Sequence, residues 1–139
     1  MEGKMALMHP RRAQVLPIMA LILSALVVLI MAALSYSVLT ARVMRALAAA
    51  EQATHAGAMQ IMVLPDGTYR LTNSATTVRR IFAIHNLSYA RLTRVTCALD
   101  DQGRPFCEAR VAVQGLFWAP RVEVSARSVL PAGVTREGQ

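Results

Sequence analysis

The sequence predicts an α+β fold in which one long N-terminal helix is followed by a small antiparallel sheet with a short helix. Three observations indicate this class. No charged residue occurs at the 29 positions between Arg12 and Arg42. An alanine-rich stretch without proline follows at 41–59, and alternating apolar and polar residues after position 90 are typical of half-buried strands. Because the chain has only 139 residues, it has room for a single domain besides this membrane-length segment.

The composition supports this division and excludes several classes of protein. The chain is 55% hydrophobic and 17% charged, whereas soluble proteins average roughly 45–50% and about 25%. Disordered chains have the opposite bias, so disorder is not expected. The net charge of +7 comes mainly from arginines that are scattered singly, apart from Arg79-Arg80, and no aromatic residues interleave with them. We therefore expect a solvated surface or contact with anionic lipid headgroups, and no nucleic-acid partner.

The residues from Val15 to Leu34 form an apolar run of 20 residues, and a helix of about 20 apolar residues spans a bilayer core of about 30 Å. We predict a transmembrane helix at 15–40, preceded by a basic head at 1–14. Pro17 is expected in the first turn, where a missing N–H costs nothing, and Tyr36 at the interface with water. A cleaved signal peptide would have a shorter core and a small-residue cleavage site, and a buried soluble helix would rarely lack charge for so long.

The alanine-rich segment at 41–62 is expected to continue the membrane helix outward as a stalk. One narrow apolar face of this stalk is made by Val43, Leu47, Ala50 and Gly57. A face of such small residues can approach another helix closely, and an isolated alanine helix buries too little apolar surface to be stable. We therefore favour packing of this face against a neighbouring helix over helix propensity without a partner.

The rest of the chain, at 63–139, is expected to form an extracytoplasmic α+β domain. It opens with a short hairpin, because Pro-Asp-Gly at 65–67 is typical of a turn between two strands. A helix is predicted over 74–85, with Ser74 as its N-cap and Asn86 as its stop. Its apolar stripe consists of Val78, Ile81, Phe82 and His85.

Three strands are predicted from alternation with a period of two. The first two, at 94–99 and 107–113, flank the turn-rich segment DDQGRP and therefore form a hairpin, and the third lies at 121–130. The inward-facing positions are Val95, Cys97, Leu99, Cys107, Ala109, Val111, Val113, Val122, Val124 and Ala126. A sheet with one apolar face needs a covering layer, which we expect to be a helix.

Cys97 and Cys107 are the only cysteines, and each lies five residues from Gln102 at the centre of the predicted hairpin. They should therefore stand directly opposite each other, close enough for a disulfide. A zinc site would need four ligands, and the histidines show no ligand spacing, while a redox pair would normally be C-x-x-C. We favour a structural disulfide over free thiols, which places the C-terminal domain in an oxidising compartment.

The orientation in the membrane follows from charge and from the cysteines. Lys4, Arg11 and Arg12 precede the apolar run, whereas Arg42 and Arg45 follow it. The positive-inside rule thus favours a cytoplasmic N-terminus by one charge. The expected disulfide adds to this preference, because it requires the C-terminal domain to lie outside the plasma membrane.

The sequence contains none of the common catalytic, metal-binding or nucleotide-binding motifs. We therefore do not expect an enzyme, a cofactor, a bound metal or a small-molecule substrate. The segment at 115–120 is unusual because Leu116, Phe117 and Trp118 are consecutive apolar residues in an expected loop. These three residues either fold back over the sheet edge or form an exposed interface loop for another subunit or the membrane surface.

The layout of these segments resembles that of a known family. The opening of the apolar run (RRAQVLPIMALIL), the alanine-rich stalk (ARVMRALAAAEQATHAGAM) and the closing strand (VEVSARSVL) are similar to the TadE/TadG-like proteins of the tight-adherence (Flp-type) pilus system, and more broadly to pilin-like subunits. The resemblance implies a pilin-like fold and a bitopic protein of the bacterial inner membrane that is a minor pilin, a pseudopilin or an assembly factor.

The same resemblance implies the partners and the location of the chain. Its partners would be other pilin-like subunits or copies of itself, together with the pilus assembly machinery. It would lie in the inner membrane or in an extracellular pilus. The alternative is a membrane-tethered extracytoplasmic binding or scaffold domain unrelated to pili.

Overall fold

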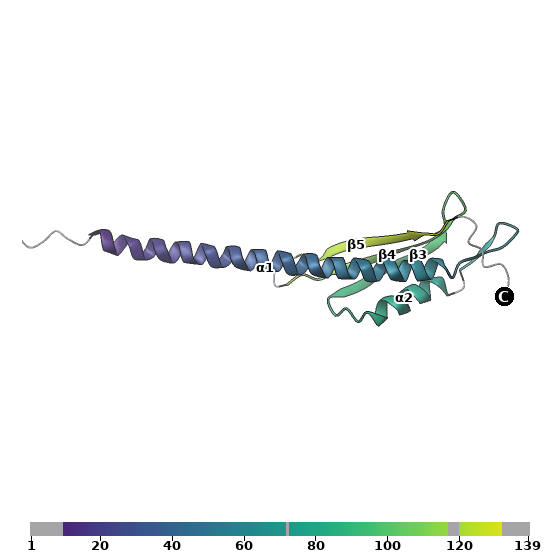
Figure 1. Cartoon of the computed structure of the whole chain (residues 1–139), viewed down its shortest axis with the longest axis horizontal. Helices are drawn as coiled ribbons and strands as arrows, with labels where there is room; N and C mark the ends of the chain where they lie inside the picture. The colour runs from purple at the N-terminus through teal and green to yellow at the C-terminus, as the bar shows by residue number, and fades with distance from the viewer. Residues whose placement is uncertain (1–9, 72, 117–119, 132–139) are drawn as a thin grey trace, which may run out of the picture.

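The computed structural model describes residues 10–71, 73–116 and 120–131. In chain order its elements are α1 (Pro10–Ala58), β1 (Met62–Val63), β2 (Tyr69–Arg70), α2 (Ser74–Ile84), β3 (Ala90–Leu99), β4 (Pro105–Val113) and β5 (Val122–Val129). Figure 1 shows α1 as a long rod, with the sheet and α2 packed along its C-terminal part. The fold is therefore α+β, with a long apolar helix followed by a small antiparallel sheet and a short helix.

The rod is one helix of 49 residues without a break, which corresponds to about 70 Å at about 1.5 Å per residue. The apolar run and the alanine-rich segment are thus continuous. The helix begins at Pro10, and proline is well suited to a first helical position. The prediction that Pro17 lies in the first turn is wrong, because the residues before it are already helical and it stands inside the helix.

A short hairpin follows the rod and confirms the strand–turn–strand interpretation of this segment. β1 and β2 pair antiparallel, with Met62 opposite Arg70. In the turn, Gly67 has a φ of 80°, a value that glycine adopts without strain. The carboxylate of Asp66 accepts hydrogen bonds from the hydroxyl and the N–H of Thr68, at 2.6 and 3.0 Å. These bonds stabilise the charged form and lower the pKa of Asp66 below its ordinary value of 3.8.

The short helix α2 forms where the sequence predicts it, but its ends differ. Asn73, not Ser74, is the N-cap; it has a φ of 64° and makes no side-chain capping bond. Ser74 begins the helix and is buried. At the other end, Asn86 has a φ of 45° and stops the helix as expected. The prediction that His85 belongs to the apolar stripe is wrong, because the helix ends at the preceding residue and the side chain of His85 is exposed.

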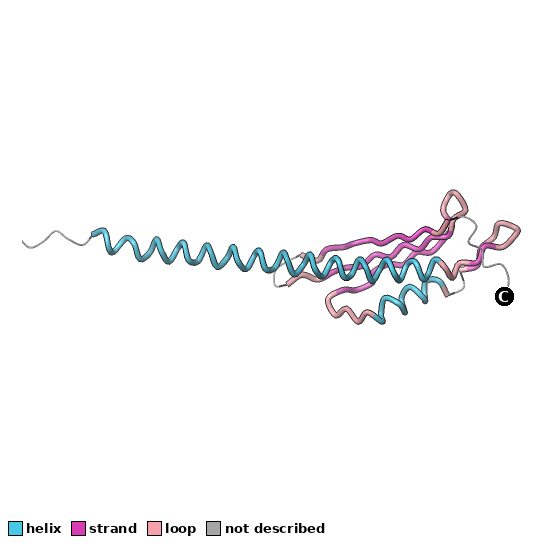
Figure 2. The backbone as a smooth tube through the Cα atoms, in the orientation of Figure 1, coloured by secondary structure: helices cyan, strands magenta, loops and turns pink. Residues whose placement is uncertain are grey.

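β4 is the central strand of a three-stranded antiparallel sheet with the order β3-β4-β5. Cys97 on β3 lies directly opposite Cys107 on β4, which confirms the predicted hairpin register. β5 pairs antiparallel with β4, with Val111 opposite Val124. Figure 2 shows that the strands of this sheet extend alongside α1. One face of the sheet is therefore covered by helices, and the other is open as far as residues 10–71, 73–116 and 120–131 are concerned.

The hydrophobic core lies between the sheet, α2 and the second half of α1. On β4, every second residue from Pro105 is buried, and four of these side chains are fully buried: Cys107, Ala109, Val111 and Val113. The residues that α1 contributes are short: Ala46, Ala49, Ala50, Ala53 and Ala58, all at most 2% exposed. Val78 and Phe82 of α2 also belong to the core, together with Ile61, Ala126 and Leu130. Because alanine leaves little side chain between the helix axis and its neighbours, α1 can lie close to both α2 and the sheet.

Candidate functional site

The first candidate site is the apolar part of α1, which has no cover within the described structure. Each large apolar side chain from Val15 to Leu34 is at least 40% exposed. The helix is long and apolar enough to cross a membrane. A contiguous apolar surface of this length marks contact with lipid or with other apolar helices.

The hydroxyl groups of this helix are satisfied in a way that suits an apolar surrounding. Each serine and threonine hydroxyl of the described span donates to a backbone carbonyl about one turn earlier, at 2.8–3.0 Å: Ser24 to Leu21, Ser35 to Met31, Ser37 to Leu34 and Thr40 to Tyr36. In hydrocarbon an unpaired hydroxyl costs several kcal/mol, about 4–8 on the cyclohexane scale. With these bonds, the polar side chains do not prevent the segment from being surrounded by lipid.

The second candidate site is the junction between the apolar rod and the C-terminal domain, where Arg42 ends the charge-free run. The Nη1 atom of Arg42 donates to the carbonyl of Gln114 at 3.0 Å. Its guanidinium carbon lies 5.1 Å from the centre of the Tyr89 ring, within cation–π range. The N–H of Gln114 in turn donates to the carbonyl of Tyr89 at 2.8 Å. Arg42 therefore fastens α1 to the two loops that precede β3 and follow β4.

The disulfide joins the edge strand β3 to the central strand β4. Cys97 and Cys107 are bonded, and their Cα atoms are 4.1 Å apart. Cys107 is fully buried, and Cys97 is half-buried on the same face. The sequence prediction of a disulfide between these residues agrees with the structure. The bond lies inside the core, next to Gly57 of α1.

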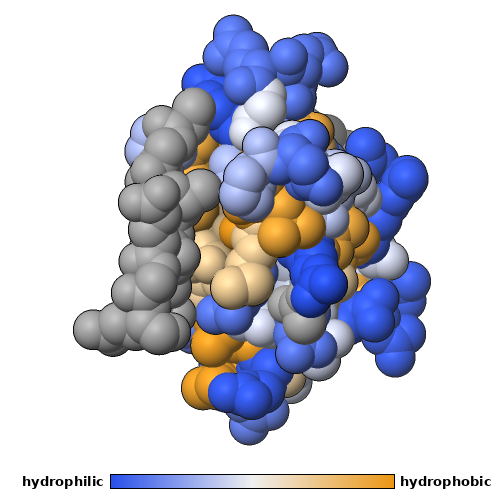
Figure 3. Space-filling model, turned by 90° about the vertical axis from the view of Figure 1, so that its right-hand side faces the viewer, coloured by the Kyte–Doolittle hydropathy of each residue, from blue (hydrophilic) through white to orange (hydrophobic). Residues whose placement is uncertain are grey.

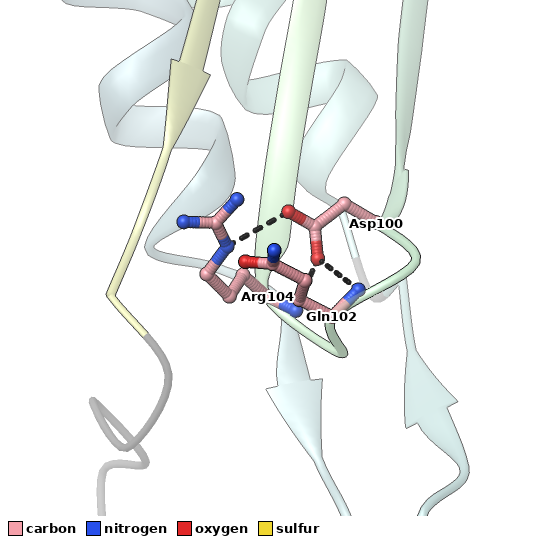
Figure 4. Close-up of polar contacts among 3 residues, drawn as sticks. All are labelled: Asp100, Gln102 and Arg104. Atoms are coloured by element: carbon pink, nitrogen blue, oxygen red, sulfur yellow. Dashed lines mark hydrogen bonds and ion pairs between the residues drawn. The ribbon is translucent and has the colours of Figure 1, made fainter.

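The hairpin turn beyond the disulfide is held by Asp100 (Figure 4). Its carboxylate accepts from the backbone N–H of Arg104 at 2.8 Å and of Gln102 at 3.0 Å. The Nε of Arg104 donates to the second oxygen at 2.8 Å. The bond from the Arg104 N–H contributes most to keeping the pKa of Asp100 below its ordinary value of 3.8. Asp100 is thus a structural carboxylate of the turn.

The four residues of the predicted helix-packing face lie toward the interior of the domain. Ala50 and Gly57 are buried, and Val43 and Leu47 are half-buried against the core. In this structure they face the chain's own sheet and α2. The stalk segment is therefore also part of the core of the domain that follows it.

The expected interface loop is only partly described. Leu116 is half-buried, next to the buried Gly115. Phe117 and Trp118 lie outside the described residues. The loop follows directly on Gln114, so it leaves the sheet at the same end as the Arg42 junction.

The third candidate site is the open face of the sheet, where side chains from three strands form a shallow hollow of about 220 Å³. Its lining residues are Arg94, Thr96, Phe106, Glu108, Arg110 and Arg127. Arg94 stands directly opposite Arg110 in the strand pairing. Like charges in directly opposed positions destabilise a sheet. The arginines around the hollow therefore concentrate positive charge, and the opposed pair Arg94 and Arg110 does not stabilise the sheet.

The far end of the domain differs in character from the apolar rod. Figure 3 views the molecule from the end opposite the start of α1, and hydrophilic residues make up most of the described surface there. The rod and this end thus give the molecule one apolar and one polar pole. This polarity suits a chain that crosses a lipid boundary and presents its domain to water.

Comparisons with known proteins add no relative. No family model matches the chain, and neither a curated protein nor a solved structure is found to be similar to it. Among residues 10–71, 73–116 and 120–131, no group of three or more His, Cys, Asp or Glu side chains is placed to hold a metal ion.

Sequence reasoning missed the two arginine arrangements. The arginines of the open face look isolated along the chain, yet strand pairing brings Arg94, Arg110 and Arg127 around one hollow. The sequence did carry a sign of this cluster, because each of the three arginines occupies an outward position in the predicted strand alternation. The contact of Arg42 with Gln114 spans 72 residues, and no local pattern announces it.

Proposed function

We propose that this protein is a membrane-anchored structural or assembly subunit of a Tad/Flp-type pilus, a minor pilin or pseudopilin. It acts by packing of its long helix and by contacts of its C-terminal domain. The observation that carries the proposal is the unbroken α1, whose first half is apolar and exposed while its second half packs into the core of the domain. The resemblance of residues 11–58 to TadE/TadG-like proteins supports the same function.

The geometry suits a subunit whose role is to hold its C-terminal domain in a defined position relative to its apolar helix. A helix that is continuous with the domain core holds that domain at a fixed distance and rotation from the apolar segment. The Arg42 contacts reinforce this coupling at the point where α1 enters the domain. Subunits whose apolar helices pack side by side would therefore present their domains in a defined arrangement.

The proposed location is the bacterial inner membrane, with the N-terminus in the cytoplasm and the disulfide-bonded domain outside. The disulfide supports an oxidising compartment for the domain. The second candidate is a membrane-tethered extracytoplasmic binding or scaffold domain unrelated to pili. The open, arginine-lined sheet face is as compatible with this second candidate as with a pilus subunit, because a binding surface does not require a filament.

Fractionation of the native protein separates the two candidates. Surface filaments are sheared from cells and compared with washed membranes by immunodetection and intact-mass measurement. A pilus subunit should appear in the filament fraction, and its mass should show whether the N-terminal head is retained. A resident single-pass inner-membrane protein serves as the control for membrane contamination. Recovery of the full-length chain from membranes alone, in cells that carry filaments, would contradict the filament-subunit function and favour a tethered scaffold.

A further inference from the structure

Around the hollow on the open face of the sheet, arginines outnumber the carboxylates that can pair with them. In strand register, one row of this face is Arg94, Arg110 and Ser125, and the next is Thr96, Glu108 and Arg127. Arg110 lies 3.5 Å from Glu108. Within the described residues, no carboxylate approaches Arg94 or Arg127 within 4.0 Å. Three guanidinium groups therefore share one internal carboxylate around the hollow.

One of these arginines is held in place by an aromatic ring. The guanidinium of Arg127 lies 4.3 Å from the centre of the Phe106 ring, a cation–π distance. The ring shields one face of the guanidinium, while its N–H groups stay available for an acceptor. A guanidinium oriented in this way loses less rotamer freedom when it binds a carboxylate. The hollow is thus partly preorganised for an anionic group.

The dimensions of the hollow fit side chains better than a large ligand. Its volume of about 220 Å³ is below the roughly 300–1,000 Å³ of typical small-molecule pockets. That room accommodates one or two carboxylate side chains lying across adjacent strands. Bidentate pairing with arginine is the strongest way for such groups to bind.

The direction of the face favours a lateral neighbour over a lipid surface. The strands run along α1 (Figure 1), so the open face points sideways from the rod. If α1 crosses a bilayer, this face looks along the membrane plane and not down onto headgroups. A nucleic acid fits less well, because Glu108 on the same face repels phosphate and Phe106 is already covered by Arg127.

We propose that the hollow lined by Arg94, Arg110 and Arg127 is a docking site for an acidic segment of a partner polypeptide, whose carboxylates pair with these guanidinium groups. This proposal rests on the proposed function in one respect: it takes the C-terminal domain as the part of the protein that contacts partner polypeptides. A binding assay measures the affinity of the hollow for an acidic peptide directly, so its result does not depend on whether the protein enters filaments.

The test uses the full-length protein in detergent and a fluorescein-labelled peptide of ten glutamates, with a ten-glutamine peptide as the uncharged control. Fluorescence anisotropy should show saturable binding of the glutamate peptide alone. The paired variant Arg94→Gln/Arg127→Gln should weaken this binding at least tenfold. The matched control Arg79→Gln/Arg80→Gln removes the same charge from exposed positions of α2 and should change the affinity less than twofold. Equal weakening by both pairs would overturn the proposal in favour of general charge attraction.

A second variant keeps the test independent of any loss of folding. Ser125 is exposed and lies beside Arg110 in the same row. Ser125→Glu supplies a carboxylate within the chain, so it should raise the thermal midpoint and weaken peptide binding at least fivefold. Unchanged peptide affinity in this variant contradicts the site. Binding of a ten-nucleotide oligothymidine more tightly than the peptide, with loss in the same variants, would assign the face to nucleic acid instead.

Discussion

Gly57 of α1 lies against Val78 of α2 with no room for a side chain between them. A Cβ atom added to Gly57 would collide with Cγ2 of Val78 and would lie 3.1 Å from the carbonyl oxygen of Ser74. It would also lie 3.2 Å from the sulfur of Cys107. The absent side chain of Gly57 thus lets α1, α2 and the disulfide meet in one place.

The first prediction is that Gly57→Ala destabilises the domain although alanine is the better helix former. The gain in helix propensity is about 1 kcal/mol, whereas overpacking a filled core costs roughly 1–3 kcal/mol or more. Because a backbone oxygen and a disulfide sulfur are also close, neighbours cannot simply rotate away, and we expect a net loss of about 1–2 kcal/mol. Denaturant unfolding in detergent measures it.

A double-mutant cycle with Val78→Ala provides the control for this prediction. Removal of Cγ2 of Val78 should open room for the new methyl group, so the combined loss should be smaller than the sum of the single losses. Strictly additive losses would show that the contact between these two side chains does not determine the effect.

The second prediction concerns the disulfide between Cys97 and Cys107. The two residues are separated by 10 positions, and closing a short loop is worth about 2–3 kcal/mol in the chain-entropy model. Reduction of the wild-type protein should therefore lower its unfolding free energy by about that amount. Cys97→Ala/Cys107→Ala should lower it similarly and should not respond further to reductant. A wild-type transition that is the same with and without reductant would contradict a stabilising role of this bond.

The third prediction is a pH dependence of the hairpin turn. The pKa of Asp100 is lowered in the folded protein, so folding is favoured by the ionised form. That contribution is complete well above the ordinary pKa of 3.8 and is lost as the pH falls through the lower folded value. Asp100→Asn should thus lower the thermal midpoint near pH 7, and the difference from wild type should shrink below pH about 4. The exposed neighbour Asp101 provides the matched control, Asp101→Asn, for which we expect a smaller effect near neutral pH. A midpoint difference that is constant across this range would exclude the charge of Asp100 as its cause.

Which features follow from the sequence depends on how local their causes are. The hairpin register and the disulfide could be predicted because the turn fixes the offset of Cys97 and Cys107 from one central residue. The end of α2 was harder to predict, since His85 fits the apolar spacing but the helix ends at Ile84 and His85 is its C-cap, directly before the positive φ of Asn86. The open arginine hollow needed the pairing of three strands, of which only two share a hairpin. The packing of Gly57 required the tertiary structure, because small size alone does not say which neighbour fills the space.

The fourth prediction concerns the junction at Arg42. Arg42→Met should keep the apolar stem of the side chain but remove the hydrogen bond to Gln114 and the contact with Tyr89. Bonds from charged donors and exposed cation–π contacts together suggest a loss of about 1 kcal/mol or somewhat more. Hydrogen exchange should become faster at the amides of Gln114 and its neighbours. Arg45→Met removes an exposed arginine three residues along the same helix and should leave these exchange rates unchanged. Equal exchange in wild type and Arg42→Met would mean that other contacts hold the loop.

The fifth prediction tests what surrounds the apolar half of α1. Val27 is close to the centre of the charge-free run, and its side chain is 52% exposed. An arginine at the centre of a membrane helix costs about 2.5–3.5 kcal/mol on insertion scales. Val27→Arg should therefore reduce the fraction of protein that resists extraction from membranes at alkaline pH. Gln52→Arg places the same charge on an exposed position of the same helix within the domain and should leave that fraction unchanged. If Val27→Arg stays in the membrane but disappears from filaments, the apolar surface serves helix packing between subunits more than contact with lipid. If both variants fractionate like wild type, α1 is not anchored by its apolar run.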